Sequence, residues 1–451
     1  MSNVLVVGKG SREQVIKEKL QSSPYVNNVY NCDEDTNILA EYPGMDLVVV
    51  GSEECLVGGL VDFLSSHDIQ CFGPSKKAAQ IEGSKEFSKQ LMTELNIPTP
   101  PYYDYLPQIG EFVIKKSGLA KGKGVFLPET YEEATQILSQ IDETVIIEEK
   151  LYGEEVTVMG FCNGSDVFIM PQAQDYKRVY DKDEGPNTGG MGAVCPVTVL
   201  NKQELSSIHQ YMTRVVKKLN YIGVLYAGVI KTAQGCFVLE FNCRFGDPEA
   251  QVVLNLLEND LFEVMISCIQ RKQVNLKWKN MFAANVVLSH KDYPYSRLDT
   301  PVPISTSCID KNIKLYYGNV CDNKTTGGRV MSVVSVERDL NTALNTVYTN
   351  ASKIEYKGIY YRRDIGLKEL LRGKRRTFPR VAVLGSTNGT SCEKLLKSSM
   401  VSLVLSNVKY AGIFEMAKKY NVPYVYFEEN RLINILRCFS DLVIHNPCYQ
   451  K

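Results

Sequence analysis

The apolar positions of this chain fall into short runs that are separated by longer polar segments. Residues 4–7 read Val-Leu-Val-Val and residues 47–50 read Leu-Val-Val-Val, and glycine follows each run. Apolar runs of this length are typical of strands buried on both faces, and the segments between them predict helices. Strands that alternate with helices form parallel sheets, whose ligands bind at the carboxyl ends of the strands. We therefore expect an α/β domain over residues 1–98.

The turn after the first apolar run contains Gly8 and Gly10. A dinucleotide-binding fingerprint would have a third glycine at position 13, where this chain has Glu13. Two interpretations therefore stay open, a tight strand-to-helix turn and a phosphate site at the N-terminus of the following helix.

Prolines at positions 98, 100 and 101 interrupt the pattern, because proline is excluded from helix interiors. A strand over 113–115, a loop over 121–124 and a returning strand over 125–127 then predict a glycine-rich hairpin. This hairpin is not a Walker P-loop, because only three residues separate Gly118 from Gly122 and because Gly124 follows Lys123. The stretch KKSGLAKGKG at 115–124 combines four lysines with three glycines. Such a composition predicts a flap over a polyphosphate.

Two further segments suit a nucleotide. Apolar strands end in carboxylates at residues 148–149 and 154–155, which is compatible with a purine-ribose pocket and equally with solvated strand edges. Residues 185–192 contain four glycines in eight positions. We expect a mobile loop here, with many free backbone N–H groups that could bind an anion.

The segment 238–249 reads VLEFNCRFGDPE. On a strand, Glu240 and Asn242 point to one face while Leu239 and Phe241 face the core. Two hard oxygen donors suit Mg²⁺, although an ordinary polar strand edge would show the same spacing. Arg244, just beyond, offers a planar fork for a carboxylate or phosphate.

Length, charge and cysteine content narrow the class of protein. A chain of 451 residues is too long for one core and predicts two to four domains. Lys plus Arg and Asp plus Glu both number 51, so no net field favours nucleic acid or a membrane surface. The 13 cysteines include no CxxC pair, which favours a reducing compartment. With neither a signal peptide nor a membrane-spanning run, we expect a cytoplasmic protein without nucleic-acid or membrane partners.

The chain resembles the glycinamide ribonucleotide synthetases, or phosphoribosylamine–glycine ligases, of the ATP-grasp superfamily. The resemblance is close to continuous from Val4 to Gly366. Its markers are GKGSRE at 8, DLVVVGSE at 46, FGPSKKAAQIEGSK at 72, GLAKGKGV at 118, IEEKLYGEEV at 147, QDYKRVYDKDEGPNTGGMGA at 174, LYAGV at 225, EFNCRFGDPE at 240, GGRV at 327 and GIYYRRDIG at 358.

The resemblance implies a multidomain α/β and α+β protein. A Rossmann-like N-terminal domain over 1–98 would precede an ATP-grasp domain over 99–270, whose flap subdomain covers about 112–180. A C-terminal lobe over 271–370, a basic linker over 371–379 and a partial Rossmann-like α/β unit over 380–451 would follow.

The same resemblance implies a set of site residues. ATP would contact Lys85, Lys115, Gly122, Gly124, Glu148, Glu149, Lys150, Leu151, Glu155, Arg178 and Asn187, and Mg²⁺ or Mn²⁺ would be held by Glu240 and Asn242. The groups nearest the chemistry would be Lys123, Arg244 and Asp247. Glycine and 5-phosphoribosylamine would be held by Gly10, Arg12, Glu13, Asp175, Gly189, Gly190, Arg362 and Arg363.

The implied reaction activates a carboxylate, because an amine does not displace oxide from it unaided. Glycine would attack the γ-phosphate of ATP to give glycyl phosphate, which the amine of 5-phosphoribosylamine would then attack. Positioning and charge neutralisation suffice for this chemistry, and closure of the flap and the 185–192 loop would exclude water. A non-catalytic ATP-binding scaffold for purine enzymes remains the alternative, as does a ligase with another amine or amino acid.

Three positions depart from the family's usual residues. Gln14 and Tyr317 each replace a histidine, and Ser117 replaces an aspartate beside the flap. None of these changes removes a predicted metal ligand or nucleotide lysine.

The last stretch resembles the first half of the glycinamide ribonucleotide formyltransferases. Apolar runs at 381–384, 401–405 and 422–427 follow the basic linker, and Val443-Ile444-His445-Asn446-Pro447 only partly matches the segment expected to carry catalytic residues. We expect no formyltransferase activity from this unit. A half domain of this kind would pack on the ligase, form a homodimer or associate with other purine enzymes.

Overall fold

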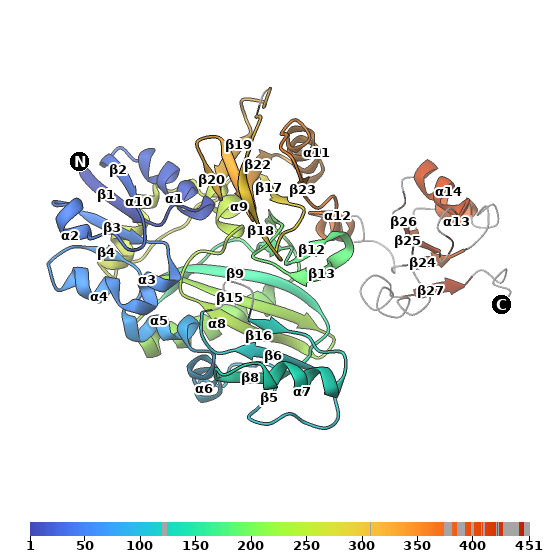
Figure 1. Cartoon of the computed structure of the whole chain (residues 1–451), viewed down its shortest axis with the longest axis horizontal. Coiled ribbons are helices and arrows are strands. Elements are labelled where there is room, and N and C mark those ends of the chain that lie inside the picture. Colours follow the sequence, from blue (N-terminus) through green and yellow to red (C-terminus); the bar gives the residue numbers. More distant parts are fainter. Residues whose placement is uncertain are drawn as a thin grey trace. The chain divides into compact units, whose positions relative to one another are not determined.

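The computed structural model describes residues 1–119, 124–306, 308–373, 381–385, 393–397, 401–406, 408, 411–420, 422, 424–426 and 442–445. The chain forms two compact units, Met1–Gly366 and Leu367–Lys451 (Figure 1). Each unit has its own apolar core and is described separately. Among these residues, no helix has both the length and the apolar character needed to cross a bilayer.

The first domain contains a four-stranded parallel sheet in the order β2-β1-β3-β4, as the apolar runs predict. Its strands are β1 (Ser2–Val7), β2 (Val26–Cys32), β3 (Leu47–Val50) and β4 (Cys71–Phe72). Its helices are α1 (Ser11–Gln21), α2 (Ile38–Glu41), α3 (Glu53–Gly58), α4 (Leu60–Ser65), α5 (Lys76–Gly83) and α6 (Lys85–Glu94). All four residues of β3 are buried, since the sheet is covered on both faces.

The glycine-rich hairpin forms as predicted, within a small antiparallel sheet of order β5-β8-β6-β7. Its strands are β5 (Tyr102–Tyr103), β6 (Phe112–Lys116), β7 (Val125–Phe126) and β8 (Val145–Glu149). Lys115 lies opposite Val125 in the register. Helix α7 (Tyr131–Ser139) buries Ala134 against the Ile114 face of this sheet. The tip of the hairpin, including Gly122 and Lys123, lies outside the described residues.

A second antiparallel sheet has the order β10-β9-β15-β16. Its strands are β9 (Glu154–Asn163), β10 (Val167–Ile169), β15 (Ile222–Thr232) and β16 (Gly235–Asn242). Helices α8 (Lys202–Leu219) and α10 (Leu261–Ile269) pack on β9 and β15, while α5 and α6 of the first domain pack on β16. The strand that carries Glu240 and Asn242 therefore lies beside the first domain.

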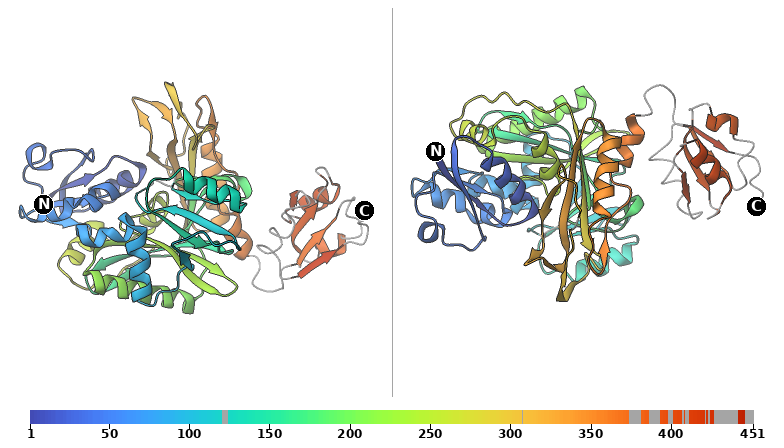
Figure 2. Two further views of the ribbon diagram at one scale, coloured as in Figure 1. Left: turned by 60° about the horizontal axis from the view of Figure 1, so that its bottom comes forward. Right: turned by 90° about the horizontal axis from the view of Figure 1, so that it is seen from above.

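The C-terminal lobe is built on a third sheet, of order β11-β14-β17-β22-β19, with β23 (Ile359–Tyr360) paired to β17. Its other strands are β11 (Gln174–Asp175), β14 (Gly192–Cys195), β17 (Phe282–His290), β19 (Lys314–Tyr317) and β22 (Arg329–Glu337). Helix α11 (Leu340–Ala351) packs across β17 and β22, and α9 (Glu249–Leu256) packs on β14 and β17 (Figure 2). Strands β11 and β14 lie within residues 99–270, but they belong to the sheet of the C-terminal lobe. The expected domain boundary at residue 270 therefore does not coincide with a boundary between sheets.

Two small antiparallel ribbons complete the first unit. One pairs β12 (Arg178–Tyr180) with β13 (Glu184–Asn187), around the 3-10 turn η1 (Asp181–Asp183). The other has the order β18-β21-β20, formed by β18 (Arg297–Pro303), β20 (Val320–Cys321) and β21 (Lys324–Gly327).

The second unit contains a parallel sheet of order β26-β25-β24-β27, in agreement with the α/β prediction. Its elements are α12 (Leu367–Gly373), β24 (Val381–Leu384), α13 (Glu393–Lys397), β25 (Val401–Ser406), α14 (Ile413–Lys419), β26 (Tyr424–Tyr426) and β27 (Leu442–His445). The linker expected over 371–379 is wrong at its start, because α12 continues through Gly373. Its relation to formyltransferases stays a prediction.

Since the two units have separate cores, we expect removal of residues 374–451 to leave the first unit folded. Differential scanning calorimetry of the truncated chain should show the main unfolding transition at an unchanged temperature. A matched full-length sample provides the reference. A transition lowered by several degrees, which in a unit of this size corresponds to a loss of roughly 3 kcal/mol or more, would show that the tail completes a shared core.

Candidate active site

The glycine turn after β1 is filled by the side chain of Glu13. A Cβ at Gly51 would lie 2.5 Å from Glu13 Oε1, and one at Gly10 would lie 2.8 Å from Oε2. Gly8 also has a φ of +110°, which few other residues adopt. The Glu13 carboxylate is buried and is paired with Arg12 Nε at 2.7 Å. A carboxylate in this position disfavours a phosphate there, so the structure supports the tight-turn interpretation.

A chain of alternating charges joins the first domain to the turn after β16. Arg12 contacts Glu53 at 3.2 Å, Glu53 contacts Arg244 Nε at 3.3 Å, and Arg244 Nη2 contacts Glu82 at 2.8 Å. The backbone carbonyl of Phe245 accepts hydrogen bonds from Arg12 (3.2 Å) and Arg244 (3.3 Å). Glu82 Oε2 also accepts from the Cys243 N–H at 2.7 Å. These contacts hold the segment that follows the two predicted metal ligands.

The guanidinium groups of Arg12 and Arg244 lower the pKa of Glu53, whereas the pKa of Glu82 is raised. Burial would raise the pKa of Glu53, but Arg244 and Arg12 lower it to about 2. Burial raises the pKa of Glu82 above its ordinary value even though Arg244 opposes the shift. Arg12 and Arg244, which were expected at the substrate and the chemistry, are therefore engaged in ion pairs. Glu53 and Glu82 lie inside the DLVVVGSE and FGPSKKAAQIEGSK markers, but sequence reasoning gave them no role.

Lysines of α6 and β6 meet at a buried carboxylate. Lys89 and Lys115 contact the two oxygens of Glu148 at 3.1 and 2.8 Å, and the side chains of Lys89 and Glu148 are each only 2% exposed. Burial lowers the pKa of Lys89 to about 8. With both oxygens paired, Glu148 orients Lys115, and its expected contact with adenine or ribose stays a prediction. Lys85, one turn before Lys89, donates to Gly118 O at the base of the flap at 3.1 Å.

The segment after β8 is held by its backbone. Glu149 N–H donates to Pro101 O and Lys150 N–H donates to Glu111 O, both at 2.9 Å. Leu151 is half-buried and the Glu149 side chain is exposed. Glu155 is paired with Lys177 at 2.8 Å. Gly124 accepts a hydrogen bond from Lys116 N–H at 2.8 Å, at the described end of the hairpin.

Glu240 and Asn242 share one face of β16, as the alternation predicts. Burial would raise the pKa of Glu240, but the ammonium groups of Lys177 and Lys115 hold it below its ordinary value. The carboxylate is therefore ionised. Among the residues that the structure describes, neither side chain makes a hydrogen bond or an ion pair, and no cluster of three or more His, Cys, Asp or Glu side chains forms a metal site. Two unengaged oxygen donors beside lysines fit a divalent cation that takes its other ligands from phosphate and water.

The 185–192 segment differs from the predicted mobile anion loop. Gly185 to Asn187 belong to strand β13. The following N–H groups are engaged: Thr188 donates to Lys177 O, Gly189 to Tyr293 OH, Gly190 to Thr188 Oγ1 and Met191 to Tyr176 O, at 2.7–3.0 Å. Few free donors remain for an anion because hairpin and side-chain hydrogen bonds occupy them.

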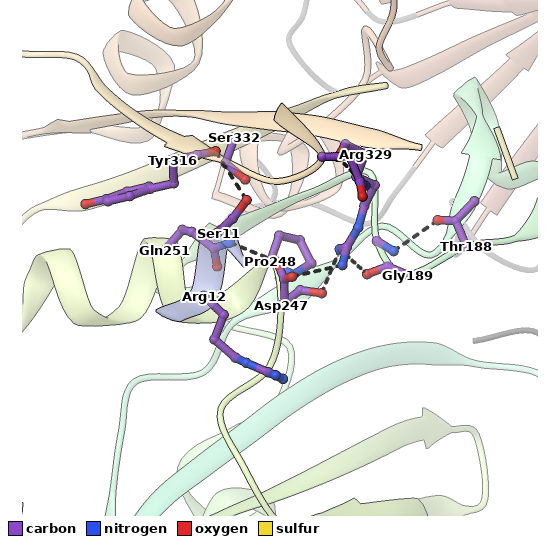
Figure 3. A network of polar contacts seen from close by, with 12 residues as sticks. Ser11, Arg12, Thr188, Gly189, Asp247, Pro248, Gln251, Tyr316, Arg329 and Ser332 are labelled. Atoms are coloured by element: carbon purple, nitrogen blue, oxygen red, sulfur yellow. Dashed lines mark hydrogen bonds and ion pairs between the residues drawn. The ribbon is translucent and has the colours of Figure 1, made fainter. Parts of the chain in front are cut away.

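Arg329, at the start of β22, holds this segment in place. Its Nη1 donates to Gly189 O at 2.5 Å and to Asp247 O at 3.0 Å, while its Nη2 pairs with Asp247 Oδ2 at 2.9 Å (Figure 3). Asp247 Oδ1 accepts from Gln251 at 2.8 Å. Sequence reasoning missed Arg329, although the GGRV marker at 327 contains it. The structure thus brings Asp247, Gly189 and Gly190 together.

Arg362 and Arg363 are not grouped with these residues. Arg362 is fully buried, paired with Asp183 at 2.9 Å and Asp364 at 2.7 Å, and it donates to Arg178 O at 3.0 Å. Arg363 is exposed, with its guanidinium 4.1 Å from the centroid of the Tyr361 ring. The expected substrate role of Arg362 stays a prediction. Its contacts fix the ribbon of β12 and β13, within which Arg178 Nη1 donates to Gly185 O at 2.6 Å and Asn187 pairs with Arg178.

Two of the three departures from the family pattern contact each other. Gln14 Nε2 donates to Tyr317 O at 2.6 Å, and Tyr317 N–H donates to Gln14 Oε1 at 2.8 Å. Ser117 N–H donates to Thr144 O at 2.8 Å. All three residues are therefore held by backbone hydrogen bonds.

Comparisons with known proteins agree with this architecture. The chain matches the phosphoribosylglycinamide synthetase N domain over residues 36–82, the ATP-grasp (A) domain over 83–250 and the C domain over 283–368. It is 38% identical over 412 residues to a phosphoribosylamine–glycine ligase from Caldanaerobacter subterraneus, covering 80% of this chain and 99% of that one. The chain belongs to the phosphoribosylamine–glycine ligase family. Members of this family are ATP-dependent ligases that make glycinamide ribonucleotide in purine biosynthesis.

Two further relatives show how much of each protein the match covers. A phosphoribosylamine–glycine ligase from Thermotoga maritima superposes with a TM-score of 0.67 at 27% identity, covering 80% of this chain and all of that one. The trifunctional purine biosynthetic protein adenosine-3 of Chironomus tentans is 36% identical over 425 residues. The matched segment covers 81% of this chain but only 31% of that protein. This chain thus spans about a third of the trifunctional relative and nearly the whole bacterial ligase.

We expect Arg329→Lys to lower ligase turnover by up to about 100-fold, because a lysine cannot hold Gly189 and Asp247 with one planar fork, and displacements near 1 Å have such costs. Steady-state kinetics for each substrate would measure the effect. Arg338→Lys, at an exposed position of the same lobe, is the matched control. Unchanged turnover in Arg329→Lys would show that the fork does not position the site.

Proposed function

We propose that this chain ligates glycine to 5-phosphoribosylamine with hydrolysis of ATP, giving glycinamide ribonucleotide, ADP and phosphate. The proposal is supported by the near-complete overlap with single-function ligases. The observation that carries it is the charge arrangement around β16: Glu240 and Asn242 share one face of the strand, and the ammonium groups of Lys85, Lys115 and Lys177 are close enough to lower the pKa of Glu240. Such an arrangement suits phosphoryl transfer, which is catalysed mainly by positioning and charge neutralisation.

In this proposal, Lys115 and Lys85 contact the phosphates of ATP beneath the hairpin of β6 and β7. Lys115 is held by Glu148, and Lys85 by the carbonyl of Gly118, so both ammonium groups are positioned before the nucleotide binds. Residues 148–151 and Glu155 form the edge for the base and ribose, and Arg178 and Asn187 also belong to the nucleotide site. The tip residues Gly122 and Lys123 would complete the cover, as the family resemblance implies.

Glu240 and Asn242 would hold Mg²⁺ or Mn²⁺. A divalent ion held by these two residues would supply charge neutralisation for the phosphates of ATP. The protein's own contribution is to keep the ligands in place, through the Glu82 contact to Cys243 N–H and the ion pairs of Arg244.

The carboxylate of glycine attacks the γ-phosphate and forms glycyl phosphate, with ADP as the leaving group. The amine of 5-phosphoribosylamine then attacks the acyl carbon and phosphate leaves. Asp175, Asp247, Gly189 and Gly190 lie at the edge of the C-terminal lobe and form the acceptor side of the site in this proposal. Since Arg12, Arg244 and Arg362 are neutralised by carboxylates, they act on the substrates through the segments they hold.

We also propose that the second unit mediates association with another copy or with other purine enzymes. In its described part, β26 and β27 are the two edges of the parallel sheet. Edge strands present unpaired backbone groups to which another chain can add. Light scattering of the full chain and of the chain without residues 374–451 tests association with another copy: the same oligomeric state for both would contradict it.

We expect Glu240→Gln to lower ADP formation by roughly 100-fold or more, because the neutral amide removes the charge that a divalent cation requires. The assay follows ADP release with Mg²⁺-ATP, glycine and freshly generated 5-phosphoribosylamine, omitting each substrate in turn and testing alanine in place of glycine. Glu132→Gln, on the exposed face of α7, is the control. Release of ADP without need of glycine, or full activity of Glu240→Gln, would contradict the proposed function or the metal site respectively.

A further inference from the structure

Asp175 has a carboxylate oxygen with no partner. Oδ1 is buried and makes no hydrogen bond among the described residues. The residue lies at the end of β11, where it pairs with Ala193 of β14. A buried carboxylate oxygen without a donor is costly, so its retention calls for an explanation in terms of a ligand or a proton.

The Oδ1 atom of Asp175 lies against the backbone of Gly190. A Cβ at Gly190 would lie 2.7 Å from Asp175 Oδ1 and 2.3 Å from Pro248 Cδ, so only glycine fits there. Gly190 follows Gly189, whose carbonyl is held by Arg329. The Asp175 carboxylate therefore faces a backbone segment that Arg329 holds through the carbonyl of Gly189.

Four charged side chains influence the pKa of Asp175. Burial raises the pKa of Asp175 well above the ordinary aspartate range, and Glu249 of α9 and Glu155 of β9 raise it further. Lys177 and Arg329 oppose the shift. Glu249 is itself buried and accepts a hydrogen bond from Thr157 at 3.0 Å, which holds its side chain in place.

The proposed reaction needs a proton acceptor at its second step. When the amine nitrogen forms a bond to the acyl carbon of glycyl phosphate, the C–O bond to phosphate breaks and the nitrogen carries one proton too many. A base poised near neutral pH and shielded from water accelerates such a step. Lysines and arginines lie where the proposed site binds phosphate, and none of the residues proposed for the site is a histidine.

We propose that Asp175 is the general base that removes this proton from the amine of 5-phosphoribosylamine. The nitrogen lone pair forms the amide bond, the phosphate leaves with the electrons of the broken C–O bond, and Asp175 takes the proton. The proton then passes to solvent with the departing products. This role rests on the proposed function and extends it, because holding a substrate does not require a base.

The alternative role for the same carboxylate is to bind the ammonium group of glycine. The two roles differ in which half of the reaction needs Asp175. A glycine anchor is required before acyl phosphate forms, whereas the base is required only afterwards. Hydroxylamine separates the halves, because it is an uncharged nucleophile at neutral pH that attacks acyl phosphates without an enzymatic base.

We expect Asp175→Asn, in the full chain, to lower glycinamide ribonucleotide formation by about 10²- to 10⁴-fold. With ATP, glycine and hydroxylamine, the same variant should form glycine hydroxamate as fast as the wild-type chain. Asp104→Asn, at an exposed position, is the matched control, and Asp175→Glu should recover part of the ligation. Equal loss of both products, or loss of neither, would overturn the base assignment. A wild-type chain that makes neither product would instead contradict the proposed function and the base role with it.

The pH dependence of the wild-type chain gives a second test that does not require the variant to fold. Because a base acts in its deprotonated form, ligation should rise as pH rises through the elevated pKa of Asp175. Hydroxamate formation, compared at constant unprotonated hydroxylamine, should lack this limb. A limb shared by both reactions would overturn the proposal.

Discussion

Burial of charge beside β16 is the constraint on which the site depends. A charged group can leave water only when an opposite charge and hydrogen bonds compensate it. The chain meets this requirement by alternating signs, through Glu53 and Glu82 around Arg244 and through Lys89 and Lys115 around Glu148. Among the described residues, Glu240 makes no direct ion pair or hydrogen bond, and one oxygen of Asp175 also lacks a donor. The ion pairs thus neutralise the buried charges around β16 and leave Glu240 and Asn242 available as oxygen donors.

Local sequence patterns predicted most of the elements that carry this site. The runs at 4–7 and 47–50 are strands of a parallel sheet, strands β6 and β7 pair antiparallel, and Glu240 and Asn242 share a face. Each of these features depends on spacing within a few residues, which periodicity records directly. The strands of the second unit were predictable for the same reason, because they coincide with short apolar runs.

Contacts between distant segments were not predictable in this way. Arg329 meets a carbonyl 140 residues earlier, and Arg244 meets a carboxylate 162 residues earlier, so no periodic signal links the partners. The sequence suggested free arginines for substrates, but Arg362 lies between two aspartates. Similarly, four glycines suggested a mobile loop, whereas hydrogen bonds from side chains and hairpin order that segment. Residue type identified the charged groups, and only the fold identified their partners.

The sharing of strands between domains has a consequence for movement. Both ends of the segment between β11 and β14 are strands of the C-terminal lobe, and its middle is held by Arg329 and Arg362 of the same lobe. The hairpin sheet shares no strand with that lobe. A movement of the hairpin sheet would therefore break no strand pairing of the C-terminal lobe. Under the proposed function, release of the nucleotide would then leave the strand pairing beside Asp175, Gly189 and Gly190 intact.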